Sequence, residues 1–82
     1  MEEQIEEIVE VLEMLLENPL PNKVTARISE ILANLKYSSF SNDMLIKVQD
    51  DLELLGAMSN IDDYTRNEII NLVTYIEMLY NS

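Results

Sequence analysis

The chain has 82 residues, of which 16 are acidic and 5 are basic, and its formal net charge is -11. It contains no His and no Cys. Ser-His-Asp and Cys-His nucleophiles, zinc fingers, thiolate redox centres and iron–sulfur clusters are therefore excluded. An enclosed catalytic cleft is not expected either, because a domain of this size buries only about 60% of its unfolded surface. We predict that the protein is not an enzyme and binds no cofactor.

Hydrophobic residues make up 48% of the chain, which is typical of a folded domain. No apolar run approaches the about 20 residues that are needed to cross a bilayer. The sequence also lacks the basic segment followed by an apolar stretch that marks a secretory leader. We therefore expect one domain over residues 1–82, located in the cytoplasm and not in a membrane.

Apolar residues recur at steps of three and four along four segments of the chain. This spacing predicts amphipathic helices at about 2–17, 21–36, 42–58 and 63–80. The main apolar stripes, in chain order, are Ile5, Ile8, Val9, Leu12, Leu15 and Leu16; Val24, Ile28, Ile31, Leu32 and Leu35; Leu45, Val48, Leu52 and Leu55; and Ile69, Leu72, Val73, Ile76 and Leu79 or Tyr80. No segment alternates with a period of two, so strands are not expected.

Residues that end or begin helices separate these segments. Pro19 and Pro21 end the first helix, because proline lacks an amide donor and forces the preceding residue toward extended geometry. Ser41 or Asn42 is expected to cap the third helix. The fourth helix has several candidate starts: caps within 59–63, or Thr65, which with Glu68 has the form of a capping box.

Short links require neighbouring helices to lie mostly antiparallel, so the prediction is an all-α, up-and-down-type four-helix bundle. The apolar stripes also superimpose when the first helix is shifted by 40 residues and the second by 41. One interpretation is that the halves are two related helical hairpins. The other, which we favour, is that any two short amphipathic stripes can be brought into phase.

Three stretches of the chain resemble a known family. They are Thr65-Arg66-x-x-Ile69-x-Asn71-x-Val73-x-x-x-Glu77, the opening around Val9-Glu10-Val11-Leu12-Glu13, and Pro21-x-x-Val24. Together they resemble a small archaeal family catalogued only as uncharacterised protein family 0147. The chain departs from that pattern in the proline-free stretch 60–63 and at Ile70, where a tryptophan is usual. The resemblance implies an up-and-down-type bundle in an archaeal cytoplasm, and it implies no established activity.

The first predicted helix has many carboxylates and no base. Its glutamates are Glu2, Glu3, Glu6, Glu7, Glu10, Glu13 and Glu17. The simpler interpretation is a solvated helix face, and the alternative is a contact surface for a basic partner, with Glu3, Glu6, Glu10 and Glu13 as candidates. A metal site is not expected, because divalent sites need ligands that converge from several directions and a di-iron bundle needs Glu-x-x-His.

Aromatic and methionine side chains extend the apolar surface beyond the stripes. Tyr37 and Phe40 lie in the expected central link, and Tyr75, Met78 and Tyr80 lie toward the C-terminus. One interpretation places them in the bundle core and under the loop. The other makes Tyr75, Met78 and Tyr80 a patch for another helix or for a second copy in a homodimer.

The few bases argue against direct binding of nucleic acid, since phosphates would meet a surface of the same sign. Lys23 and Arg27 lie one helical turn apart and are expected to pair with nearby carboxylates. Arg66 is expected to connect the first turn of the last helix to Glu68 or to an adjacent helix, with a ligand-binding role as the alternative.

These observations predict a non-enzymatic helical protein–protein interaction module. The contact surface would be the acidic first helix or the aromatic C-terminal residues. The alternative is an acidic decoy or chaperone-like partner of a basic nucleic-acid-binding protein, which would act through charge.

Overall fold

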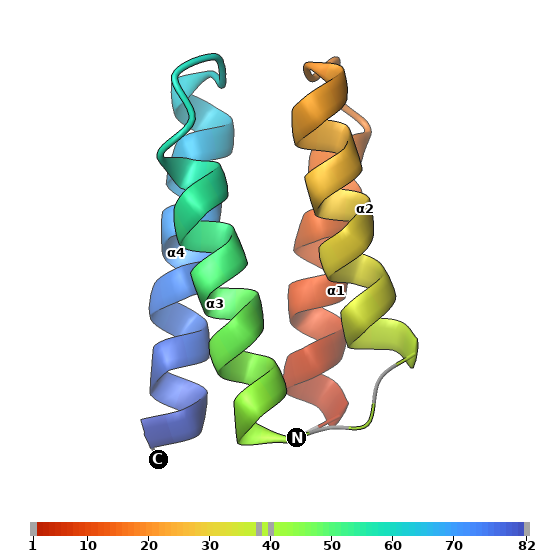
Figure 1. Ribbon diagram of the computed structural model, residues 1–82, viewed down its shortest axis with the longest axis vertical. Coiled ribbons are helices and arrows are strands. Elements are labelled where there is room, and N and C mark those ends of the chain that lie inside the picture. The colour runs from red at the N-terminus through yellow and green to blue at the C-terminus, as the bar shows by residue number, and fades with distance from the viewer. Residues whose placement is uncertain (1, 38, 40, 82) are drawn as a thin grey trace.

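The computed structural model describes residues 2–37, 39 and 41–81. It contains α1 (Glu2–Leu16), α2 (Asn22–Tyr37), α3 (Asn42–Gly56) and α4 (Asp63–Asn81), and no strand occurs among these residues (Figure 1). The predicted all-α four-helix bundle is therefore confirmed.

The four helices are arranged as two antiparallel hairpins that lie side by side (Figure 1). One hairpin is α1–α2 and the other is α3–α4, and α2 ends and α3 begins at the end of the bundle where α4 also finishes. Among the helices that contact each other, α3 and α4 pack most closely and α1 and α4 pack least closely. The α1–α4 side of the bundle is thus its most open seam.

The predicted apolar stripes form one core between the helices. Buried residues contributed by the helices are Ile8, Leu12 and Leu15; Val24, Ile28, Ile31, Leu32 and Leu35; Leu45, Val48, Leu52 and Leu55; and Ile69, Leu72 and Ile76. Each such side chain contributes about 1.5–3 kcal/mol by leaving water. Because the stripes face inward, most of the other helical residues are directed to the surface, and Gln49 and Thr65 are buried polar exceptions.

Helix boundaries differ from the predicted ones by up to two residues. Helix α1 ends at Leu16, α2 runs from Asn22 to Tyr37, α3 ends at Gly56 and α4 continues to Asn81. Tyr37 therefore belongs to a helix and not to the central link. Helix α2 starts after Pro21, whose carbonyl accepts hydrogen bonds from the amides of Val24 and Thr25, both at 3.0 Å.

Side-chain caps define the starts of the last two helices. The Ser41 hydroxyl oxygen accepts a hydrogen bond from the Met44 amide at 3.1 Å, as predicted for a cap of α3. Helix α4 begins earlier than the Thr65–Glu68 capping box would place it, so that interpretation is wrong. The Asp62 carboxylate accepts hydrogen bonds from the Thr65 amide at 3.3 Å and the Thr65 hydroxyl at 2.6 Å, which caps the helix one turn sooner.

The two hairpins share the offset seen in the sequence. Glu2 and Asn42 begin α1 and α3, and Leu16 and Gly56 end them, both pairs 40 positions apart. The starts of α2 and α4 are 41 positions apart. Three of the four pairs of helix boundaries therefore follow the same offsets as the apolar stripes, whereas the ends of α2 and α4, Tyr37 and Asn81, are 44 positions apart.

Candidate functional site

The predicted acidic surface lies on one exposed face of α1. Glu3, Glu6, Glu10 and Glu13 are all exposed. Their spacing of three, four and three places them opposite the buried stripe, because residues three and four apart share one face of a helix. Because the apolar stripe of α1 packs into the core, the face that carries these four glutamates is directed to solvent.

Hydrogen bonds engage only some of the carboxylates of α1. Glu13 pairs with Lys36 of α2 at 2.9 Å, and this hydrogen bond raises the pKa of Lys36. The Tyr75 hydroxyl donates to Glu7 at 2.6 Å. Among the described residues, Glu3, Glu6 and Glu10 have no hydrogen-bonding or ion-pair partner through their side chains. These three carboxylates are therefore available to a partner.

The aromatic C-terminal residues do not share one face of α4. Tyr75 is half-buried and donates its hydroxyl proton to Glu7 on α1, which raises the pKa of Tyr75. Tyr80 is half-buried and donates to Gln49 Oε1 on α3 at 2.7 Å. Met78 is 64% exposed. The two rings thus pack toward different helices and connect α4 to both of its neighbours, while Met78 faces solvent alone.

A buried glutamine between α3 and α4 was not singled out from the sequence. Gln49 is only 6% exposed, and its Nε2 donates to the main-chain carbonyl of Val73 at 3.3 Å while its Oε1 accepts from Tyr80. Its position one residue after Val48, on the buried side of α3, is the only sequence signal for it. The hydrogen bonds that allow an amide to be buried there depend on α4.

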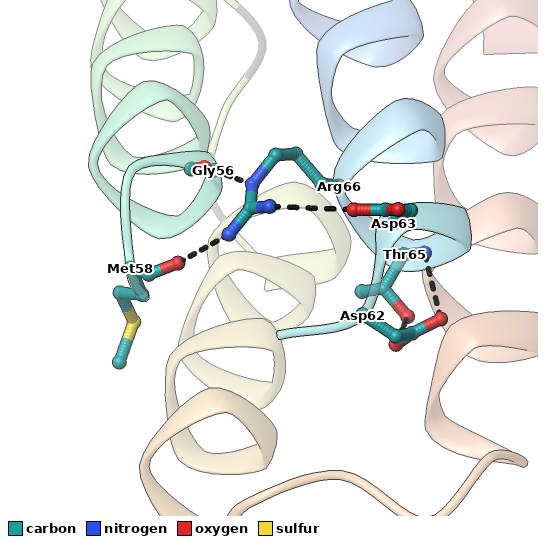
Figure 2. Close-up of polar contacts among 6 residues, drawn as sticks. All are labelled: Gly56, Met58, Asp62, Asp63, Thr65 and Arg66. Atoms are coloured by element: carbon teal, nitrogen blue, oxygen red, sulfur yellow. Dashed lines mark hydrogen bonds and ion pairs between the residues drawn. The ribbon is translucent and has the colours of Figure 1, made fainter. Parts of the chain in front are cut away.

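Arg66 connects the start of α4 to the end of α3 (Figure 2). Its Nε donates to the carbonyl oxygen of Gly56 at 3.1 Å, and its Nη2 donates to that of Met58 at 2.7 Å. Its Nη1 lies 3.7 Å from the Asp63 carboxylate. Gly56 is the last residue of α3 and Met58 lies two residues beyond it, at the end where a helix leaves carbonyl acceptors without partners. The observed contacts are with an adjacent helix end and not with Glu68.

Lys23 and Arg27 do not make the ion pairs expected of them with any described residue. Both line a groove of about 550 Å³ between the N-terminal half of α2 and the C-terminal end of α3. The other lining residues are Ala26, Glu30, Asp51, Leu54, Leu55 and Met58. Asp51 is itself paired with Lys47 at 3.0 Å. We call this feature the α2–α3 groove; it places two bases without partners beside an apolar wall.

A smaller groove of about 260 Å³ lies along the open seam between α1 and α4. It is lined by Glu7, Val11, Glu68, Asn71, Leu72 and Tyr75. Its ionisable groups are acids and a tyrosine, whereas the α2–α3 groove is lined by two bases and two acids. Of the residues that the structure describes, no three carboxylates come together as a metal-binding group.

No helix in the described part of the chain is long and apolar enough to cross a membrane. Phe40 lies outside the described residues, so the structure does not place it.

Comparisons with protein-family models, with curated proteins and with solved structures found no match to this chain.

Proposed function

We propose that the protein is a non-enzymatic helical interaction module, and that its contact surface is the outer face of α1. The observation that supports this most strongly is the group of exposed carboxylates at Glu3, Glu6 and Glu10, which have no partner among the described residues. Kinship with uncharacterised protein family 0147 and a cytoplasmic location are part of the same proposal. The partner supplies basic side chains.

Repulsion between the carboxylates on the outer face of α1 destabilises the free protein, and this favours a role in binding a basic partner. Carboxylates three and four residues apart on one helix repel each other by about 0.2–0.5 kcal/mol per pair. A basic partner relieves this repulsion when it binds. The negative charge also accelerates encounter with a positively charged surface, and both effects weaken as salt screens the charges.

The proposal is tested by affinity capture from native cell extract with charge-matched variants. One variant is Glu3→Gln/Glu6→Gln/Glu10→Gln, which removes the unpaired carboxylates of α1 and keeps the Glu13 pair with Lys36. The control is Asp50→Asn/Glu53→Gln/Glu77→Gln, which removes the same amount of charge from exposed positions on α3 and α4. We expect the same proteins to be retained by wild type and control, lost from the α1 variant, and lost from all three between about 50 and 500 mM salt.

Equal losses from the α1 variant and from the control would show that only net charge matters, which contradicts a contact surface on α1. Unchanged retention by the α1 variant would contradict it as well. If the retained proteins bind nucleic acid and are released by added DNA or RNA, α1 occupies their nucleic-acid site. The protein would then be the acidic decoy or chaperone-like partner considered above.

A further inference from the structure

We infer that the α2–α3 groove of one copy of the protein receives the outer face of α1 from a second copy. The inference rests on the proposed function, because it uses the same face of α1, and it names the basic surface that this face contacts. Four observations on the two surfaces support it: the unpaired bases, the neutralised acid, the apolar wall and the spacing of charges along both helices.

Charge is the first argument. Three of the five bases are engaged within the described structure: Lys36 with Glu13, Lys47 with Asp51, and Arg66 with Asp63. The remaining two, Lys23 and Arg27, both line the α2–α3 groove. Since Lys47 neutralises Asp51, Glu30 is the only lining carboxylate without a described partner. In a chain of charge -11, the groove thus carries an excess of positive charge.

The second wall of the groove is apolar and is held in place. Leu54 is 66% exposed, and Met58 is half-buried. Arg66 binds the main-chain carbonyl of Met58 at 2.7 Å, and the Met58 side chain extends away from that bond (Figure 2). The wall therefore offers apolar surface to an incoming helix next to the two bases.

The outer face of α1 matches this arrangement in its spacing. Lys23 and Arg27 are four residues apart, a rise of about 6 Å along α2, and Glu6 and Glu10 have the same separation along α1. Four residues beyond Glu10 lies Met14, which is 57% exposed and can reach an apolar wall. One helix thus presents two carboxylates and a methionine in a line, and the groove presents two bases and an apolar wall.

The expected association is weak and depends on salt in a particular way. The groove is only about two helical turns long, which places the contact among small, transient interfaces of under about 1,200 Å². Two copies of charge -11 repel each other at long range. At an ionic strength of about 0.15 M, charges beyond about 8 Å are screened while contacting pairs persist. Self-association should therefore be stronger there than at about 0.01 M.

The test exchanges charges between the two surfaces and measures mass by sedimentation equilibrium. The groove variant is Lys23→Glu/Arg27→Glu, and the helix variant is Glu6→Lys/Glu10→Lys. Each variant alone reverses two charges of the proposed contact and should self-associate at least about tenfold more weakly than wild type, since the loss of even one close charge pair at an interface has about that effect. An equimolar mixture should recover association, because the acidic groove of one then meets the basic α1 of the other.

A matched control has the same charge as the helix variant but keeps α1 intact. It is Glu53→Lys/Glu77→Lys, at exposed positions on α3 and α4 that do not line the groove. Because both surfaces are intact in this control, it should self-associate as wild type does, which shows that the loss in the helix variant comes from the face of α1 and not from the change in net charge. Circular dichroism of each variant verifies that it is folded before its mass is interpreted.

Three results would overturn the inference: a monomeric wild type at the highest soluble concentration, self-association that survives either variant, or no recovery in the mixture. None of these results contradicts the proposed function, because that proposal is tested separately by the capture of other proteins from cell extract. Conversely, capture that ignores the α1 variant would contradict the proposed function even if the copies associate.

Discussion

At the scale of single residues, Arg66 shows how one side chain joins two helices. Its two hydrogen bonds to the carbonyls of Gly56 and Met58 close the turn between α3 and α4, and both are part-buried. Hydrogen bonds that involve a charged group contribute about 1.5–3 kcal/mol. We expect Arg66→Ala to lower the free energy of unfolding by about that amount, measured by urea denaturation.

Arg27→Ala serves as the matched control, because Arg27 is exposed and has no described partner. Its effect should stay within about 0.5 kcal/mol. Arg66→Lys should recover only part of the loss, since one ammonium lacks the fork that reaches both carbonyls. Equal effects of Arg66→Ala and Arg27→Ala would contradict the joining role.

Asp62 makes the stability of α4 sensitive to acid. The hydrogen bond from the Thr65 hydroxyl holds the pKa of Asp62 below its ordinary value of 3.8. A carboxyl whose pKa is lowered on folding adds stability above its unfolded pKa and loses it as pH falls through the folded value. Asp62→Asn keeps a capping side chain but not the charge. We expect it to be less stable than wild type at neutral pH, with the difference vanishing below about pH 3.8. A difference independent of pH would contradict this.

Residues of this kind mark the limit of prediction from the sequence. Ser41 was predictable as a cap because its partner lies three residues along the chain. Arg66 was predictable only as a connection to Glu68 or to another helix, because the carbonyls that it binds lie 8 and 10 residues away. Asp62 competed with Thr65 as the cap of α4, and local sequence alone does not decide between them.

At the scale of elements, α4 joins the bundle through two tyrosines on opposite flanks. Tyr80 donates its hydroxyl proton to Gln49, a residue that is 6% exposed, whereas Tyr75 donates to the exposed residue Glu7. Removing the Tyr80 hydroxyl leaves a buried acceptor without its partner, which costs about 1–3 kcal/mol. We expect Tyr80→Phe to destabilise the protein by about that amount and Tyr75→Phe by clearly less, measured by thermal or urea denaturation.

A double-mutant cycle tests the same contact. Gln49→Met should reduce the cost of Tyr80→Phe, because it removes the acceptor that would otherwise be unpaired. Costs that simply add would show that Tyr80 and Gln49 act independently. This result would contradict the role of Tyr80 as the hydrogen-bonding partner of Gln49.

The sequence was sufficient to predict the helices. It was not sufficient to predict which neighbouring helix a residue at the edge of an apolar stripe contacts. A period of 3.6 residues identifies which positions are buried, and the core residues of all four helices follow this period. The apolar pattern gave Tyr75, Met78 and Tyr80 equal weight as one patch. The structure separates them, because α1 and α3 supply acceptors on different flanks of α4. A tyrosine at the edge of a stripe turns toward whichever neighbour offers a partner.

At the scale of the whole molecule, the charge of -11 is distributed unevenly between the helices. Because the unpaired carboxylates of α1 repel one another, Glu3→Gln/Glu6→Gln/Glu10→Gln should raise stability by a few tenths of a kcal/mol per removed pair. The gain should shrink as salt rises to about 500 mM, as thermal denaturation across a salt series would show. A loss of stability in low salt would contradict the repulsion.

The central claim is that the outer face of α1 contacts the α2–α3 groove of a second copy of this protein. Amide chemical shifts of the uniformly labelled protein, recorded from dilute to concentrated solution, test it most directly. The account predicts concentration-dependent shifts at Glu6 and Glu10 of α1 and at Lys23 and Arg27 of the α2–α3 groove, with the exposed face of α4 around Ile70 and Met78 unchanged. Shifts confined to α4, with α1 unaffected at every concentration, would contradict it.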